Sequence, residues 1–375
     1  MKLRFASWYI FFFAALGSML PFLSLYLKKL GWSSGSIALI LTAFPLGTLL
    51  SGPVWGTIAD RIPNARYVLN IASILTFILA WCLVGIHQGI WFLLILILFA
   101  LCRAPLLLLV DTLTVKGLGK DSAQYGRVRL WGSIAFFVGV WLVGLFSERW
   151  FAIPLVAGAG FITFAAAVTF FLPSPEKTET PPPLTFQVFK SFWNHPTLRP
   201  FWLICIVQSI TLSVYDYLYA LHIQQLKLPA TITSASISCG VLVEIGMMWL
   251  APTLLKRFSL RSILLVAILA GVPRWLLTSL SSHPAVLIAA QSLHGAVFGL
   301  WWLASIALIE KHAPQDIRYF AQSFFTALTS GLGTLLAMGF AWFTLRHFSI
   351  SSMFLWMSLA SGLSFLYYLK QKAQL

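Results

Sequence analysis

The 375-residue sequence predicts an all-α membrane protein with twelve transmembrane helices in two six-helix halves and both termini in the cytoplasm. Hydrophobic residues make up 59% of the chain and charged residues only 9%, which is too little polar surface to face water. The apolar residues gather in runs long enough to cross a bilayer, and one long polar segment divides these runs into two sets. A soluble globule, a disordered chain and a compact nucleic-acid-binding protein are therefore excluded.

The predicted spans follow from the length of the apolar runs. A helix needs about 20 apolar residues to cross roughly 30 Å of hydrocarbon. Runs broken by charges, Gly, Pro and Ser lie at residues 5–27, 36–58, 67–86, 91–114, 129–147, 150–172, 200–222, 233–254, 262–280, 285–308, 319–344 and 350–369. Because the runs are continuous, they exclude the short alternating segments of a β-barrel.

The first run begins after a basic start, MKLRFASWYI, and a cleaved signal peptide is the alternative interpretation. The apolar run continues past Gly17 to Leu27 without a small-x-small cleavage site, so a retained first helix is favoured.

The basic residues predict the orientation. Most of the 25 Lys and Arg residues fall in alternate loops on the same side as both termini. The opposite loops hold only Lys28, Lys29, Arg149, Lys227 and Arg346. Since basic residues accumulate in cytoplasmic loops, both termini are expected in the cytoplasm, and the net charge of +15 reflects topology rather than a nucleic-acid partner.

A Pro-rich polar segment, residues 173–199, is the predicted cytoplasmic linker between an amino-terminal bundle, residues 1–172, and a carboxy-terminal bundle, residues 200–375. Phe186, Phe189 and Trp193 recur there at helical spacing, so the segment is either a short interfacial helix or a plain tether. Two such halves are typical of a duplicated secondary transporter.

The sequence offers no support for cofactor or enzyme chemistry. It contains no P-loop or zinc-protease motif, and the cysteines lie in apolar runs without CxxC spacing, at Cys82, Cys102, Cys205 and Cys239. We expect no metal and no organic cofactor, with the proton gradient as the energy source. A membrane-embedded enzyme is the least favoured function, and a channel or receptor does not need titratable groups deep in its spans.

Ionisable residues inside the apolar runs are the strongest functional signal, because each costs several kcal/mol at mid-bilayer unless it is paired or hydrated. They are Arg103, Asp111, Asp216, Glu244, Arg274 and His294. Counted at about 1.5 Å per residue, Glu244, Arg274 and His294 each lie roughly 14 to 18 Å deep. These three residues are expected to form a cluster that holds or releases a proton. The alternative is a Glu244–Arg274 ion pair that only fixes helix register, with His294 hydrogen-bonded nearby.

The amino-terminal half carries its own charged set. Arg103 and Asp111 are too far apart along one helix to pair directly. Arg129, at the start of the next span, can reach back to Asp111 and form a bidentate pair or a fork for a substrate carboxylate or hydroxyl.

A loop motif indicates a family. GTIADRIPNAR, with Gly56, Asp60, Arg61 and Arg66, resembles the motif that follows the second helix of the major facilitator superfamily, although Pro63 and Asn64 replace the usual glycine and its neighbour. The resemblance implies a cytoplasmic gate in which Asp60 caps a neighbouring helix and engages a basic residue.

Within that superfamily the whole chain resembles lactose permease and, more closely, the phenylpropionate-permease-like branch. VDTLTVKGLGKDSAQYGRVRLWGSIAF resembles the segment from the fourth to the fifth span, and PRWLLT and SLHG resemble parts of the ninth and tenth. The resemblance implies that Asp111 and Arg129 bind substrate and that Ser133 and Phe136 line the site. It also places Arg274 and His294 on the arginine and histidine of the sugar permease.

The departures from the sugar permease concern proton coupling. Val297 stands at the proton-carrying glutamate, and Tyr219 and Gln291 replace an aspartate and a lysine that pair there. Asp216 keeps the other aspartate of the seventh span, without a lysine in residues 319–344. The resemblance therefore implies that coupling moves to Glu244, within VLVEIG, to His294 or to Asp216.

The favoured hypothesis is a monomeric, proton-coupled symporter in the plasma membrane, the inner membrane in bacteria, that takes up a small organic solute. In this hypothesis Arg103, Asp111 and Arg129 orient the substrate, and Glu244, Arg274 and His294 couple protonation to rocking of the halves. An aromatic carboxylate such as 3-phenylpropionate fits three arginines among aromatic residues. A sugar or nucleoside symporter is the next alternative, followed by an efflux antiporter for drugs or metabolites.

Overall fold

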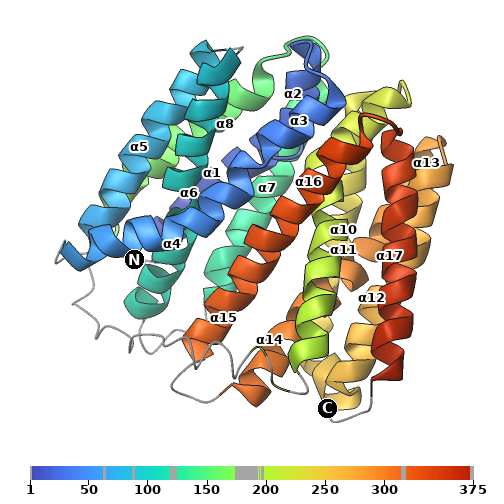
Figure 1. Ribbon diagram of the computed structural model, residues 1–375. Coiled ribbons are helices and arrows are strands. Elements are labelled where there is room, and N and C mark those ends of the chain that lie inside the picture. Colours follow the sequence, from blue (N-terminus) through green and yellow to red (C-terminus); the bar gives the residue numbers. More distant parts are fainter. Residues whose placement is uncertain are drawn as a thin grey trace. The chain divides into compact units, whose positions relative to one another are not determined.

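The computed structural model describes residues 2–61, 65–86, 89–118, 125–173, 193, 195, 198–313 and 318–371. Every regular element in these ranges is a helix, as the sequence predicts (Figure 1). The chain forms two compact units, Met1–Thr180 with Pro229–Ser234, and Pro181–Leu228 with Ala235–Leu375. The boundary at Thr180 lies inside the predicted linker.

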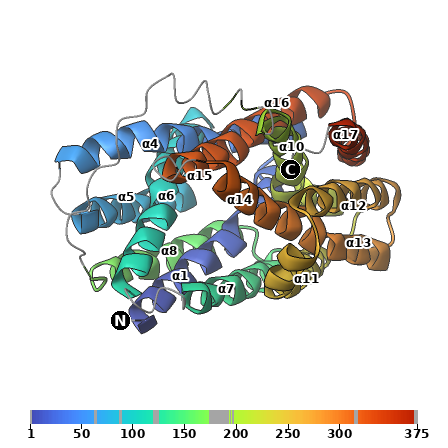
Figure 2. The same cartoon turned by 90° about the horizontal axis from the view of Figure 1, so that it is seen from below.

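The amino-terminal unit is a bundle built around its first helix. Its helices are α1 (Lys2–Met19), α2 (Leu23–Lys29), α3 (Ser34–Leu41), α4 (Ala43–Arg61), α5 (Ala65–Gly85), α6 (Gly89–Leu118), α7 (Tyr125–Phe146) and α8 (Ile153–Thr169). Helix α1 packs between α7 and α8, α8 packs on α5, α5 on α6, and α6 on α4 (Figure 2). Side chains from α1, α5 and α6 supply most of the buried apolar core.

Close contact between α1 and α7 depends on glycine. A Cβ atom at Gly17 would collide with the carbonyl oxygen of Phe136, and one at Gly139 would collide with the carbonyl oxygen of Ala14. The two backbones therefore approach more closely than any side chain allows, which is a common way for membrane helices to associate. This contact fixes α7, the helix that carries Arg129, against α1.

The carboxy-terminal unit contains the second set of helices. They are α10 (Leu198–Gln225), α11 (Ala230–Arg257), α12 (Leu260–Leu280), α13 (Pro284–Ala290), η2 (Gln291–Leu293), η3 (Gly295–Leu300), α14 (Trp301–His312), α15 (Arg318–Thr326), η5 (Ala327–Gly333), α16 (Thr334–Thr344) and α17 (Ile350–Lys370). Helix α12 packs on α17 and on the segment from α13 to α14, and α10 packs on α17, η5 and α16. Two predicted spans of this unit are therefore not uniform α-helices, since η3 and η5 are π-helical turns.

The helices coincide with all the apolar runs of the sequence, and within the described ranges ten of them are long and apolar enough to cross a membrane. The count becomes eleven if α1 and α2, which are bent by 41° at their junction, form one span. Helix α8 is apolar but has only 17 residues. The number of twelve spans and the cytoplasmic position of the termini stay predictions.

The outer surface of each bundle is apolar. Trp249 is 83% exposed, Leu280 73% and Leu363 68%, and many other large apolar side chains also point outward. An apolar surface that covers whole helices is unfavourable in water but favourable in the hydrocarbon of a lipid bilayer. The protein is therefore a multi-pass integral membrane protein.

Candidate functional site

Asp111 lies in a hydrogen-bonded group inside the amino-terminal unit. Its Oδ1 accepts a hydrogen bond of 2.6 Å from the Tyr9 hydroxyl, which is itself fully buried on α1. Thr114, one turn beyond Asp111 on α6, places its Oγ1 3.2 Å from the same hydroxyl. A buried carboxylate needs such donors because burial removes its water. The arrangement holds Asp111 in one orientation.

Arg129 approaches this group from the first turn of α7. Its guanidinium carbon lies 4.0 Å from the centre of the Phe13 ring and 5.4 Å from that of Tyr9. Gly132, one turn later, makes room for this stack, since a Cβ there would lie 2.7 Å from the Phe13 ring. Within the described ranges Arg129 forms no ion pair with Asp111, and Tyr9 contacts Asp111 through its hydroxyl and Arg129 through its ring. The expected direct pair is thus replaced by an arrangement mediated by Tyr9.

The face of α7 that carries Arg129 also carries the other predicted substrate residues. Ser133 and Phe136 follow Arg129 at spacings of four and seven residues, which places all three on one side of the helix. Ser133 and Phe136 are both half-buried. The structure therefore brings Arg129, Ser133 and Phe136 onto one surface of the amino-terminal unit.

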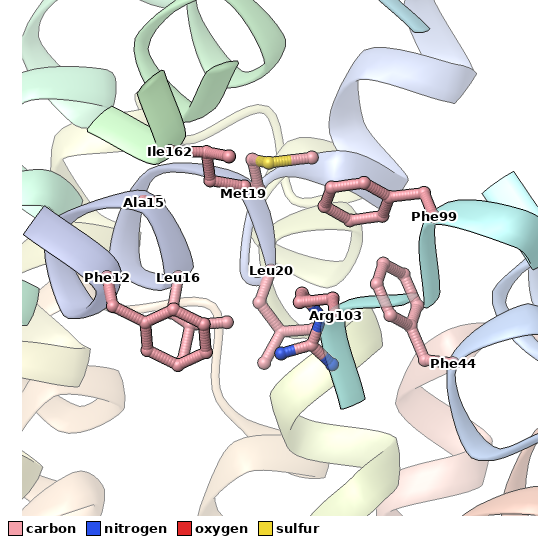
Figure 3. A pocket seen from close by; sticks show the side chains of 9 residues that line it. All are labelled: Phe12, Ala15, Leu16, Met19, Leu20, Phe44, Phe99, Arg103 and Ile162. Atoms are coloured by element: carbon pink, nitrogen blue, oxygen red, sulfur yellow. The ribbon is translucent and has the colours of Figure 1, made fainter. Parts of the chain in front are cut away.

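Arg103 lies at a separate pocket in the same unit. The pocket is lined by Phe12, Ala15, Leu16, Met19, Leu20, Phe44, Phe99, Arg103 and Ile162 (Figure 3). The Arg103 guanidinium carbon lies 5.5 Å from the centre of the Phe44 ring. Every other residue of the lining is apolar, so this guanidinium is the one charged group among the described residues of the pocket. An arginine among aromatic rings is suited to an anion that carries an apolar body.

In the carboxy-terminal unit, Glu244 and His294 form a contact between α11 and the tenth span. His294 Nε2 lies 3.4 Å from Glu244 Oε2, and the two side chains are 13% and 19% exposed. The imidazole ring stacks on Phe298 and lies 5.9 Å from the ring centre of Tyr215. A carboxylate and an imidazole at this distance can share a proton, since each gains a partner when the imidazole is charged.

Arg274 hydrogen-bonds the neutral side chain of Gln291 and does not pair with Glu244. Its Nε and Nη2 donate to Gln291 Oε1 at 3.0 and 2.9 Å, and the residue is fully buried. The guanidinium also lies over the Tyr215 ring at 4.4 Å and the Trp275 ring at 4.2 Å. The Glu244–Arg274 ion pair of the alternative hypothesis is absent from the described residues, because His294 engages Glu244 and Gln291 engages Arg274.

Asp216 and Tyr219 take different positions in this unit. Asp216 has an exposed side chain and acts on Arg274 electrostatically. The Tyr219 hydroxyl donates to Ser236 Oγ at 2.8 Å. The charges of this unit thus interact with one another. Arg274 acts on both Asp216 and His294, and Glu244 acts on the same two residues.

Neutral residues complete both groups, and sequence reasoning did not identify them as partners. Tyr9 orients Asp111, Gln291 accepts from Arg274, and Tyr215 packs against Arg274 and His294. Buried amides inside an apolar run are a usable signal for such partners, since each must find a donor or an acceptor.

The loop motif is described in part. The side chains of Gly56, Asp60 and Arg61 lie outside the described residues, and Arg66 donates a hydrogen bond to the Phe170 carbonyl. In the linker Trp193 packs edge-on against Phe324, with ring centres 6.1 Å apart, whereas Phe186 and Phe189 lie outside the described residues. The role of the gate motif stays a prediction, and the linker stays either a short interfacial helix or a plain tether.

Comparison with known proteins agrees with this architecture. The model of the MFS_1-like family matches residues 2–356. The chain is 28% identical to a probable 3-phenylpropionic acid transporter of Escherichia coli, over 90% of each protein. It is 25% identical to a maltose permease of Geobacillus stearothermophilus, over 96% of this chain and 92% of the permease.

Among solved structures, the chain is similar to the nucleoside transporter NupG, with a TM-score of 0.88, 18% sequence identity and 99% of both chains covered. This likeness concerns the fold. The chain belongs to the MFS_1-like family and is a multi-pass membrane transporter of the major facilitator superfamily.

Proposed function

We propose that the protein is a proton-coupled symporter that takes up a small aromatic carboxylate, with 3-phenylpropionate as the best representative. The observation that carries the substrate class is the pocket in which Arg103 is the single charged side chain beside Phe12, Phe44 and Phe99. The guanidinium neutralises a carboxylate, and the rings accept an aromatic body. The 28% identical relative, a probable 3-phenylpropionic acid transporter, supports the same class.

Arg129 and Asp111 contribute a second polar group on the same unit. Arg129 offers a guanidinium held over the Phe13 ring, so it loses little conformational freedom when it binds a carboxylate. Asp111, held by Tyr9, accepts hydrogen bonds from a substrate hydroxyl or from a protonated acid.

The proton is carried by the pair of Glu244 and His294. The two side chains lie 3.4 Å apart and are partly exposed, so that a proton can enter and leave. Arg274, fixed by Gln291, supplies a permanent positive charge nearby, which makes the protonation state of the pair sensitive to small movements.

A nucleoside or a sugar is the second candidate substrate. The Asp111, Tyr9 and Thr114 group favours it, because clustered hydroxyls and a carboxylate suit a ligand with many hydroxyl groups. Relatives that include a maltose permease and nucleoside permeases support this alternative.

The proposal is tested in proteoliposomes by recording external pH while 3-phenylpropionate, maltose or uridine is added. Wild type is compared with Glu244→Gln and Arg103→Gln, and Arg127→Gln serves as the matched control because Arg127 is exposed at the start of the same bundle's α7. We expect external alkalinisation with the aromatic acid, its loss in Glu244→Gln, and about tenfold weaker uptake in Arg103→Gln.

Alkalinisation with uridine or maltose alone would replace the aromatic acid by the second candidate. If none of the three solutes moves protons while counterflow of labelled 3-phenylpropionate persists, the transporter lacks proton coupling. If counterflow is absent as well, both the substrate and the coupling mechanism are wrong.

A further inference from the structure

The tenth predicted span changes its helical winding at the residue that binds Glu244. The α-helix α13 ends at Ala290, a 3-10 turn follows over Gln291–Leu293, and the π-helical turn η3 begins at Gly295. His294 lies at the junction between the two irregular turns. Such π turns are rare and concentrate at functional sites, because they cost hydrogen-bond geometry and must be held by their surroundings.

A buried side chain on α10 binds this π turn. Gln208, which is 3% exposed, donates from Nε2 to the Val297 carbonyl at 2.8 Å. In a regular α-helix the N–H of Trp301 would bond to that carbonyl, but here it bonds to the Phe298 carbonyl. A buried carbonyl requires a donor, so Gln208 compensates for the altered winding.

The π turn also sets the contact between His294 and Glu244. A Cβ at Gly295 would lie 2.7 Å from Val243 Cγ1 and 3.0 Å from the backbone nitrogen of Glu244, so η3 presses directly against α11 at the glutamate. A change of helical winding between His294 and Val297 rotates the histidine relative to α11. A shift of the turn by one residue corresponds to a rotation of about 100°. The distance of 3.4 Å between the two side chains depends on that rotation.

The next residue on α10 makes an equivalent bond to the other π turn. Ser209 Oγ donates to the Thr329 carbonyl at 2.5 Å, within η5 of the eleventh span. Two neighbouring side chains of α10 thus hold the irregular turns of two different spans. Only the turn bound by Gln208 adjoins the His294–Glu244 pair, which makes Ser209 a control on the same helix.

We propose that Gln208 is a positioning residue that, by binding the Val297 carbonyl, maintains the π turn of the tenth span and keeps His294 in contact with Glu244. This inference rests on the proposed function, in which that pair carries the proton. The other charged or titratable groups near His294 are Arg274 on α12 and Tyr215 on α10, and Asp216 on α10 acts on Arg274 and Glu244. None of them bonds to the Val297 carbonyl in the described part of the chain.

The test follows the titration of His294 by NMR in full-length protein carrying ring-labelled histidine, and the signal is assigned by its loss in His294→Asn. Four proteins are compared: wild type, Glu244→Gln, Gln208→Met and Ser209→Ala. Gln208→Met keeps the length of the side chain and removes the amide, including the Nε2 donor to the Val297 carbonyl. Gln208→Asn, which keeps an amide but is too short to reach Val297, replaces it if the methionine variant does not fold.

We expect Glu244→Gln to shift the His294 midpoint, Gln208→Met to reproduce that shift, and Ser209→Ala to leave the midpoint at the wild-type value. Proton-coupled uptake falls in parallel in Gln208→Met. A wild-type midpoint in Gln208→Met, with a shift in Glu244→Gln, overturns the role of Gln208 alone. Equal shifts in Gln208→Met and Ser209→Ala also overturn it, whereas no shift in Glu244→Gln shows that the proposed proton pair itself is wrong.

Discussion

Tyr9 and Asp111 are joined by a hydrogen bond of 2.6 Å between the hydroxyl on α1 and the carboxylate on α6. The same tyrosine ring lies 5.4 Å from the guanidinium carbon of Arg129 on α7. Three helices of the amino-terminal unit therefore meet at one neutral side chain. Tyr9 fixes the carboxylate by its hydroxyl and supports the arginine by its ring.

Replacement of Tyr9 by phenylalanine separates these two functions. The ring stays, so Arg129 keeps its support, but Asp111 loses the hydrogen bond from the Tyr9 hydroxyl and keeps the one with Tyr125. We expect KM for the transported solute to rise about tenfold, because hydrogen bonds to charged groups are worth about 1.5–3 kcal/mol. Initial uptake rates over a range of substrate concentrations measure this change.

The matched control for Tyr9 is Tyr67→Phe, since Tyr67 is 60% exposed on α5. It should leave KM at the wild-type value. Equal KM values for Tyr9→Phe and wild type would mean that the orientation of Asp111 has no part in binding.

Arg129→Lys tests whether transport needs a planar guanidinium. Lysine keeps the charge but does not stack flat on Phe13, and it binds a carboxylate through a single point. We expect uptake to fall at least about tenfold. The neighbouring Arg127→Lys, at an exposed position, should transport normally. Unchanged uptake in Arg129→Lys would contradict a bidentate role for Arg129.

The sequence predicts the helices well because hydrophobic runs of membrane length have few other solutions. It does not predict where those helices change winding. The π turn at Gly295–Leu300 depends on a donor from Gln208, which lies far away in the chain. A break of this kind arises from tertiary contacts, so the local sequence carries no periodic signal for it.

The candidate site also contains features that the sequence predicts and features that it does not. Charged residues such as Glu244 and His294 are conspicuous because ionisable groups are rare in apolar runs. Their actual partners are partly neutral, as the bond from Arg274 to Gln291 shows, and neutral polar residues are common in such runs. The alternative pairing of Glu244 with Arg274 rests on depth alone, which does not specify the direction of a side chain around its helix.

Gln291→Leu is expected to destabilise the carboxy-terminal unit strongly. The substitution removes the acceptor of two hydrogen bonds from Arg274, a fully buried cation. Loss of hydrogen bonds from a charged group costs about 1.5–3 kcal/mol, and Arg274 keeps its interactions with Tyr215 and Asp216. The thermal unfolding temperature in detergent measures the effect.

Gln291→Glu provides the complementary test, since it keeps the oxygen acceptor for Arg274 and adds an opposite charge, while it removes the donor to Thr278 and the Leu287 carbonyl at 3.3 and 3.4 Å. It should unfold near the wild-type temperature, as should Gln225→Leu at an exposed position of α10. A wild-type unfolding temperature for Gln291→Leu would show that Arg274 finds another acceptor.

Gly139→Ala tests the close approach of α1 and α7. The added methyl group would collide with the Ala14 carbonyl oxygen and lie 3.1 Å from both the backbone nitrogen and Oγ of Ser18. Backbone atoms do not move aside as a flexible side chain does, so the two helices must separate, at a cost of about 1–3 kcal/mol.

Because α7 carries Arg129, separation also moves the guanidinium away from Phe13, and uptake should fall together with the unfolding temperature. Gly160→Ala, in the interior of α8 with no atom near the added methyl group, should leave both unchanged or raise stability by about 0.5–1 kcal/mol. If both alanine variants behave alike, the contact between α1 and α7 is looser than the structure indicates and does not position Arg129.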